Sequence, residues 1–125
     1  MTVPTRHLDL GCGLKPRNPY NATNLHGIDI RKLDHWLTPQ NFEYKSANLS
    51  VEPIPYDDNY FDSVSAFDFL EHIPRQLILQ DGKTANSFID LMNEIFRVLK
   101  PNGKFFALTP VYPHASVFVD PTHVN

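Results

Sequence analysis

The chain has 125 residues, a length that suits one domain built around one core. Its 11 Lys and Arg residues against 14 Asp and Glu residues give a net charge of -3, so it lacks the basic field that holds phosphate backbones. One cysteine excludes an internal disulfide, no run approaches the roughly 20 apolar residues of a membrane span, and the first residues lack the apolar core of a secretory signal. We therefore expect a soluble, cytoplasmic protein with no membrane segment, and a nucleic-acid substrate is disfavoured.

Short strands with short connections are expected in the first half of the chain. Residues 7–10 alternate polar and apolar side chains and run directly into Gly11-Cys12-Gly13, which indicates a strand that stops at a tight turn. A second strand is expected at 25–30, and Pro16 and Pro19 reduce the crossover before it to a loop or a single turn. One helical turn is expected at 33–37, and a third strand at 42–47.

The second half predicts a fourth strand at 61–67 and two helices. A weak helix is expected to begin near Ile73, with Pro74 in its first turn and Leu77 and Ile78 facing inward. The strongest helix is expected over 84–99, because apolar side chains recur there at helical spacing: Phe88, Leu91, Met92, Ile95, Phe96 and Leu99. Arg97 and Lys100 suit its carboxyl end, and Pro101-Asn102-Gly103 separates it from a fifth strand at 104–109.

Strands separated by crossovers predict a single α/β domain over 1–125, with a doubly wound, mostly parallel sheet. Ligands of such sheets bind at the carboxyl ends of the strands. Two glycines follow the first strand there, where a side chain would keep a ligand from the backbone, and an ordinary tight turn is the less favoured alternative when they are taken alone. Asp29 ends the second strand, where its carboxylate can accept hydrogen bonds from both hydroxyls of a ribose.

These residues resemble the class I S-adenosylmethionine-dependent methyltransferases, of the type 11-like domain, from about residue 7 to residue 109. Five segments are similar to that family's motifs in the same order: Leu8-Asp9-Leu10-Gly11-Cys12-Gly13, Gly27-Ile28-Asp29-Ile30, Asn48-Leu49, residues 54–62 leading to Leu70-Glu71-His72, and residues 96–103. The resemblance implies a Rossmann-like sheet, S-adenosylmethionine as cofactor and S-adenosylhomocysteine as product. It also implies methyl transfer to a small or medium-sized acceptor that the sequence does not identify.

The resemblance also implies roles for individual residues. Gly11 and Gly13, with Cys12 between them, would approach the methionyl part of the cofactor, and Asp9 would help to hold its ammonium. Asp29, followed by Ile30, would hold the ribose. The remaining implied contacts are Asn48 and the Leu49 amide at the adenine, and the backbone near Phe67 at the methionyl end.

The sequence departs from the family pattern in two places. Lys15, followed by Pro16, stands where many members have a third glycine. Lys15 or Arg17 is the candidate partner of the cofactor carboxylate, and a solvated loop lysine is an equally favoured interpretation of Lys15. The family's usual seven strands exceed the five expected here, so the C-terminal hairpin is missing and the chain looks truncated after the fifth strand. Residues 110–125 would form a loop on the substrate side or a truncated tail, and the open sheet edge would be covered by that segment, by a second copy or by a partner.

His72 is the candidate general base for a hydroxyl or amine acceptor, and a capping or packing histidine is the alternative. A second polar group, Tyr112, His114, Asp120 and His123, is expected to line the acceptor pocket, and its loose spacing does not predict a metal site. Cys12 is expected to be a packed side chain and not a reactive thiol.

Two other functions stay open at this stage. A nicotinamide-dependent oxidoreductase would have the same kind of parallel sheet, with an acidic residue on the second strand. Residues 13–16, however, lack the third glycine of its fingerprint. A non-catalytic methyltransferase-like domain that binds or stabilises a partner is the other alternative.

Overall fold

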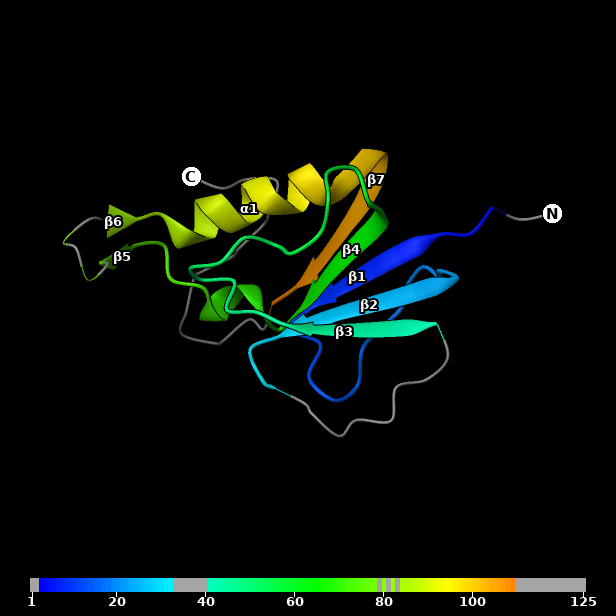
Figure 1. Ribbon diagram of the computed structural model, residues 1–125, viewed down its shortest axis with the longest axis horizontal. Coiled ribbons are helices and arrows are strands. Elements are labelled where there is room, and N and C mark those ends of the chain that lie inside the picture. Colours follow the sequence, from blue (N-terminus) through cyan, green and yellow to red (C-terminus); the bar gives the residue numbers. More distant parts are fainter. Residues whose placement is uncertain (1–2, 33–40, 79, 81, 83, 110–125) are drawn as a thin grey trace.

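The computed structural model describes residues 3–32, 41–78, 80, 82 and 84–109. Five parallel strands form the main sheet in the order β3-β2-β1-β4-β7 (Figure 1). If the five strands are numbered by their order along the chain, their order across the sheet is 3-2-1-4-5. The direction of this order reverses beside the first strand. The parallel α/β sheet expected from the sequence is therefore confirmed.

The first three strands form one side of the sheet. They are β1 (Arg6–Leu10), β2 (Asn24–Asp29) and β3 (Phe42–Ser46). The connection between β1 and β2 contains no helix, as Pro16 and Pro19 predicted, because proline removes the N–H donors that a helix needs. The helical turn expected at 33–37 lies outside the described residues.

The other side of the sheet consists of β4 (Phe61–Phe67) and β7 (Leu99–Leu108). The β4 strand agrees with its expected bounds, whereas β7 begins five residues earlier than expected. Leu99 already pairs with Phe61, and the pairing shifts register before Ser63 meets Lys104. Asn102 lies in this irregular part of β7 with a φ of 66°, a left-handed conformation that Asn adopts more readily than most residues.

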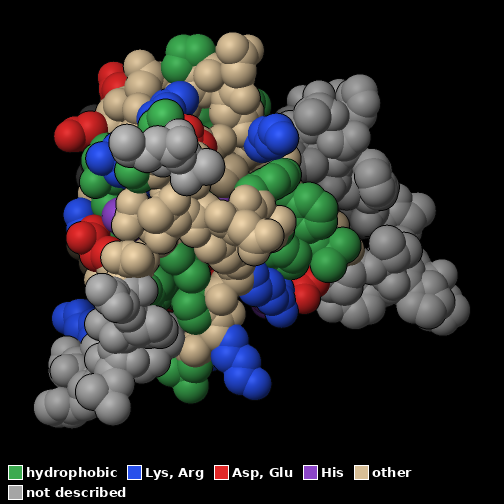
Figure 2. Space-filling model, turned by 90° about the vertical axis from the view of Figure 1, so that its right-hand side faces the viewer, with side chains coloured by type: hydrophobic (Ala, Val, Ile, Leu, Met, Phe, Trp, Pro, Cys, Tyr) green, Lys and Arg blue, Asp and Glu red, His purple; other side chains and the backbone are tan. Residues whose placement is uncertain are grey.

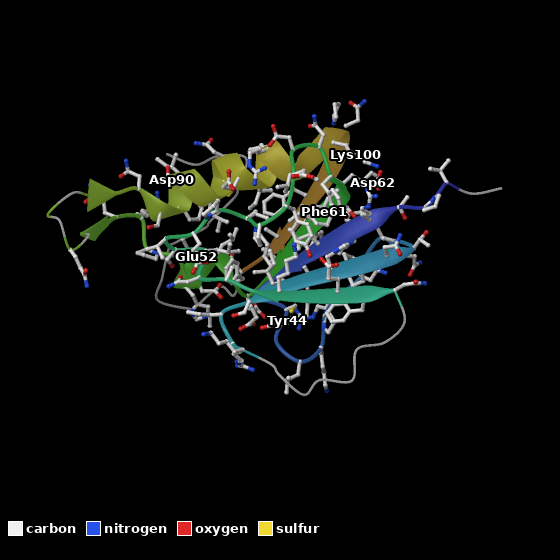
Figure 3. All side chains as sticks on the ribbon, viewed as in Figure 1. Tyr44, Glu52, Phe61, Asp62, Asp90 and Lys100 are labelled. Atoms are coloured by element: carbon white, nitrogen blue, oxygen red, sulfur yellow. The ribbon has the colours of Figure 1, made fainter. Side chains whose placement is uncertain are left out.

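One helix, α1 (Ser87–Val98), covers one face of the described sheet (Figure 1). Its buried apolar stripe consists of Phe88, Leu91, Met92, Ile95 and Val98, which join the sheet's core side chains in one cluster. Figure 3 shows Phe61, which is fully buried, between the sheet and this helix, and Lys100 beside Asp62 at the start of β4. The expectation that Phe96 also faces the core is wrong, because Phe96 lies at the flank of the stripe and is 61% exposed.

The prediction of a weak helix near Ile73 is also wrong. The chain instead forms a short 3-10 helix, η1 (Leu70–His72), and then an antiparallel pair of two-residue strands, β5 (Leu77–Ile78) and β6 (Thr84–Ala85). Because residues 84–85 pair in β6, α1 begins at Ser87 and not at the expected residue 84. Pairing between residues several positions apart overrides a weak local helical preference, and a two-residue strand has no periodicity that a sequence can display.

The two edge strands of the described sheet are β3 and β7. On the face shown in Figure 2, basic and acidic side chains are interspersed, so that face carries no field of a single sign. Among the described residues, no helix has the length and apolar character required to cross a membrane.

Candidate functional site

The turn after β1 lies against the end of β2. The backbone N–H groups of Gly11 and Cys12 donate to the carbonyl oxygen of Ile28 at 2.8 and 3.2 Å. The N–H of Gly13 donates to Oδ2 of Asp29 at 2.8 Å, and the N–H of Arg31 donates to Oδ1 at 3.1 Å. The glycine turn and the carboxylate that the sequence singled out are therefore neighbours, and the backbone holds both carboxylate oxygens in place.

Gly11 is required by its conformation and by its surroundings. Its φ of 66° lies in the left-handed region, and a Cβ atom at this position would lie 2.5 Å from Cδ1 of Phe69. Gly13 has a similar φ of 57°, but a Cβ atom there would meet nothing within 4 Å. The two glycines of the turn thus serve different purposes, since only Gly11 keeps space clear.

A cavity of about 340 Å³ opens at the carboxyl ends of β1, β2 and β3. We call it the Asp29 cavity. Of the residues expected to contact cofactor or acceptor, it is lined by Gly11, Asp29, Ile30, Asn48, Leu49 and His72. Asn48 closes a turn there by accepting the Ser50 N–H at 3.1 Å on Oδ1, which leaves its amide nitrogen available as a donor.

A second cavity, of about 370 Å³, opens at the carboxyl ends of β1 and β4. We call it the Asp9 cavity. Its lining contains the other expected residues Asp9, Cys12 and Phe67, together with the proposed carboxylate partners Lys15 and Arg17. Gly11, Arg31 and Asp68 line both cavities, so the two spaces meet at these residues. Gly13 lines neither cavity, and its contribution is the hydrogen bond to Asp29.

Asp9 is a buried carboxylate that is only 2% exposed. Its Oδ2 accepts the Arg17 N–H at 2.8 Å, and its Oδ1 accepts the Ser65 hydroxyl at 2.8 Å. Burial raises the pKa of Asp9 to about 6, against the opposing effect of these two hydrogen bonds and of the Arg17 charge. A cation in the Asp9 cavity would be attracted to this carboxylate in its ionised form.

Of the two candidate carboxylate partners, Arg17 is the more firmly held. Its guanidinium carbon lies 4.5 Å from the centre of the Phe67 ring, and its backbone N–H is bonded to Asp9. Lys15 is exposed.

Cys12 is buried between the turn and β2. Burial raises the pKa of its thiol to about 12, and the charges of Asp9 and Asp29 act in the same direction. A thiol with this pKa is almost entirely protonated near neutrality, which agrees with a packing role.

His72 lies at the end of η1, beside the Asp29 cavity. Its side chain is 73% exposed, and Nε2 lies 3.4 Å from Oε1 of Glu71. The histidine is accessible to a ligand in the cavity, and a carboxylate lies beside its ring.

The sequence reasoning did not identify Asp68, Phe69 or Arg31 as site residues. Asp68 follows β4 with a φ of 52°, and its N–H donates to the Leu108 carbonyl at 2.7 Å. A sequence signal existed only for Asp68, since Asp is among the few residues that enter the left-handed region with little strain after a strand.

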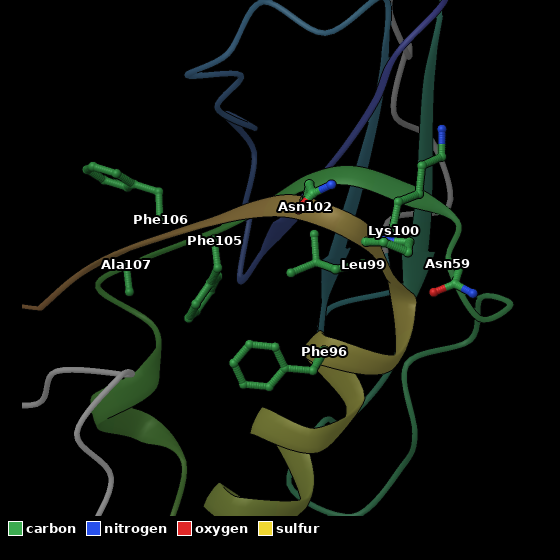
Figure 4. A pocket seen from close by; sticks show the side chains of 10 residues that line it. Asn59, Phe96, Leu99, Lys100, Asn102, Phe105, Phe106 and Ala107 are labelled. Atoms are coloured by element: carbon green, nitrogen blue, oxygen red, sulfur yellow. The ribbon is translucent and has the colours of Figure 1, made fainter.

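A larger cavity than these two lies elsewhere in the described residues. It has a volume of about 700 Å³ and lies along β7, where Phe96 and Phe105 flank it from α1 and β7 (Figure 4). None of the expected site residues lines it. Among the described residues, no cluster of three His, Cys, Asp or Glu side chains could hold a metal ion. Tyr112, His114, Asp120 and His123 lie outside the described residues.

Comparisons with known proteins agree with this fold. A family model described as a methyltransferase domain matches residues 8–107. The sterol 24-C-methyltransferase of Schizosaccharomyces pombe is 29% identical over 112 residues, which are 81% of this chain and 26% of that protein. The chain thus spans about a quarter of the length of this curated relative.

Two solved structures share the fold. The [4+2]-cyclase SpnF has a TM-score of 0.55 and 24% identity, over 80% of this chain and 37% of its own. The trans-methyltransferase CalH, solved in complex with SAH, has a TM-score of 0.56 and 17% identity, over 83% of this chain and 31% of its own.

Proposed function

The chain belongs to the class I S-adenosylmethionine-dependent methyltransferase family, and from this premise we propose that it binds S-adenosylmethionine across the Asp29 and Asp9 cavities and transfers the methyl group to a small or medium-sized acceptor. The observation that carries the proposal is the pair of cavities that meet at Gly11, with a carboxylate in each. A nucleoside with an amino-acid tail needs two such compartments side by side.

The nucleoside occupies the Asp29 cavity in this proposal. Asp29 accepts hydrogen bonds from the ribose hydroxyls, because each carboxylate oxygen retains acceptor capacity beyond its one backbone N–H. Asn48 and the Leu49 amide face the adenine edge, and Ile30 lies along the nucleoside.

The methionyl part occupies the Asp9 cavity. Asp9 attracts the ammonium, and the backbone near Gly11 and Phe67 borders the chain. Arg17 is favoured over Lys15 as the partner of the cofactor carboxylate, because its backbone and its guanidinium are already held beside the cavity. A carboxylate and a guanidinium that line the same cavity match the two charges of the zwitterionic tail.

Methyl transfer to a nucleophile is a displacement at an already activated carbon, so positioning the two reactants supplies much of the acceleration. His72 is the proposed base for an acceptor that must lose a proton, because it borders the cavity and is open to solvent. The net charge of -3 favours a small molecule over nucleic acid as the acceptor.

Titration calorimetry of the purified chain tests the proposal. S-adenosylmethionine and S-adenosylhomocysteine should bind, and a nicotinamide dinucleotide should not. Incubation with labelled S-adenosylmethionine and a panel of small hydroxyl, amine and thiol acceptors then identifies the substrate class by methyl uptake. Binding of the nicotinamide dinucleotide alone would overturn the proposal, and cofactor binding without transfer to any acceptor would favour a non-catalytic domain.

A further inference from the structure

A row of buried polar side chains extends from Asp9 into the sheet. His7 and Asp9 lie on β1 with their side chains on the same face, because they are two residues apart. On the adjacent strand β4, Ser63 and Ser65 are likewise two residues apart and pair in register with His7 and Asp9. All four residues are at most 4% exposed.

The row is linked by short hydrogen bonds. His7 Nδ1 lies 2.6 Å from the Ser63 hydroxyl oxygen, and His7 Nε2 lies 2.7 Å from the Ser65 hydroxyl oxygen. Ser65 in turn donates to Oδ1 of Asp9 at 2.8 Å. The row therefore ends at the carboxylate that lines the Asp9 cavity.

Counting donors and acceptors assigns a direction to every hydrogen bond. A hydroxyl has one hydrogen, and Ser65 gives it to Asp9, so Ser65 must accept from His7 Nε2–H. Burial lowers the pKa of His7 to about 4, so its ring is neutral near pH 7 and carries only this one hydrogen. Nδ1 is then an acceptor, and Ser63 donates to it. Each hydrogen in the row points toward Asp9.

We infer that Ser63, His7 and Ser65 form a one-way hydrogen-bond chain that holds the Asp9 carboxylate ionised and oriented toward a cationic group in the Asp9 cavity. His7 and Ser65 are positioning residues, since neither lines the cavity and both act through Asp9. The assignment of the cationic group as the cofactor ammonium rests on the proposed function, whereas the existence of the hydrogen-bond chain does not. The charged and titratable groups around Asp9 are His7 on its own strand, Cys12, Lys15 and Arg17 in the turn, Asp29 and Arg31 at the end of β2, and Asp68 after β4.

The test is the pH dependence of S-adenosylmethionine affinity, measured by titration calorimetry from pH 5 to pH 8.5. In the unmodified chain, affinity should fall as the pH decreases through the pKa of Asp9, near 6. Ser65→Ala removes the hydroxyl that stabilises the ionised carboxylate, so the midpoint should move up by about one pH unit. Ser65→Thr retains the hydroxyl and should keep the original midpoint even if its extra methyl group lowers stability.

Ser63→Ala is the matched control. It removes the same group from the same strand at a similar depth, but Ser63 contacts only the far side of His7. The pH midpoint of S-adenosylmethionine affinity should move less in Ser63→Ala than in Ser65→Ala. Equal midpoints in Ser65→Ala and the unmodified chain would overturn the inference while leaving the proposed function in place.

Nuclear magnetic resonance of the free chain tests the same row without a ligand. The ¹⁵N shifts of the His7 ring should show a neutral tautomer protonated on Nε2 from pH 7 to pH 8.5, where Asp9 is ionised, and the Asp9 carboxyl should titrate at higher pH in Ser65→Ala. A ring protonated on Nδ1, or an unchanged Asp9 titration, would overturn the inference. If S-adenosylmethionine fails to bind the unmodified chain at any pH, the proposed function fails and these spectra still decide the inference.

Discussion

The backbone N–H of Gly13 donates a 2.8 Å hydrogen bond to the Asp29 carboxylate and joins the turn after β1 to the end of β2. The hydrogen bond lies within the chain and fixes the carboxylate beside the turn. A side chain that is held in position loses less conformational entropy when it binds a ligand.

Replacement of Asp29 should weaken cofactor binding without unfolding the chain. Asp29→Ala removes the acceptor for the ribose hydroxyls, and each lost charged hydrogen bond should cost on the order of 1.5–3 kcal/mol of binding free energy. Calorimetric titration with S-adenosylhomocysteine measures the loss. Asp57→Asn, at an exposed loop position, is the control and should bind like the unmodified chain. Unchanged affinity in Asp29→Ala would refute the placement of the ribose.

The two glycines of the turn should respond differently to alanine. Gly13→Ala introduces only the left-handed strain of about 1–2 kcal/mol, because its Cβ atom would lie in open space. Gly11→Ala adds the 2.5 Å approach to the Phe69 ring, so its loss of stability should be larger and its cofactor affinity lower. Urea denaturation and calorimetry of both variants check this order. Equal losses in the two proteins would contradict the assigned role of Gly11.

Replacement of His72 should separate turnover from binding. His72→Ala removes the proposed base but no predicted cofactor contact, so affinity for S-adenosylmethionine should stay within a few-fold. The rate of methyl transfer to a hydroxyl or amine acceptor should fall by about 10²–10⁴-fold. Single-turnover measurements with labelled cofactor report the rate. Full turnover in the variant would instead support a packing or capping role.

Arg97 ties the loop before β4 to helix α1. Its guanidinium donates to the carbonyls of Ile54 and Tyr56, each at 2.8 Å, and it also pairs with Glu94 and Asp58. Arg97→Ala should lower the free energy of unfolding by about 1.5–3 kcal/mol, and Arg97→Lys should recover only part of it, because an ammonium cannot reproduce the planar set of donors. Urea denaturation measures both changes.

Lys100→Ala is a suitable control for the Arg97 variants. Lys100 makes one partly exposed pair with Asp62 at 3.2 Å, so its removal should cost at most about 1 kcal/mol. If Lys100→Ala lowered the free energy of unfolding as much as Arg97→Ala does, the hydrogen bonds from Arg97 to the loop carbonyls would add nothing beyond its charge pairs.

Cys12 should resist alkylation in the folded chain. With its pKa raised to about 12, the thiolate fraction at pH 8 is on the order of 10⁻⁴, and burial limits access further. Mass spectrometry after iodoacetamide treatment should show almost no adduct, whereas the same residue should react readily in guanidinium chloride. Rapid labelling under native conditions would contradict the packed placement of Cys12.

The local pattern of residues was sufficient to predict the elements that position the site. The alternation around Leu8 and Leu10, the glycines that follow and the carboxylate of Asp29 are short-range features. Each reports on its own strand or turn, since strand and helix periods are local properties of the chain. The apolar spacing that predicted α1 is likewise a local feature, although it wrongly included the exposed Phe96.

The sequence by itself determined the parallel sheet, its glycine turn and the residues grouped at the strand ends. Only the tertiary structure decided that the serines of β4 face His7 and Asp9, that Arg97 reaches the Ile54 carbonyl, and that the chain pairs β5 with β6 in place of a helix. These outcomes depend on the register between segments far apart in the chain. Residue spacing within one segment carries no information about that register, so it emerges only when the whole core packs.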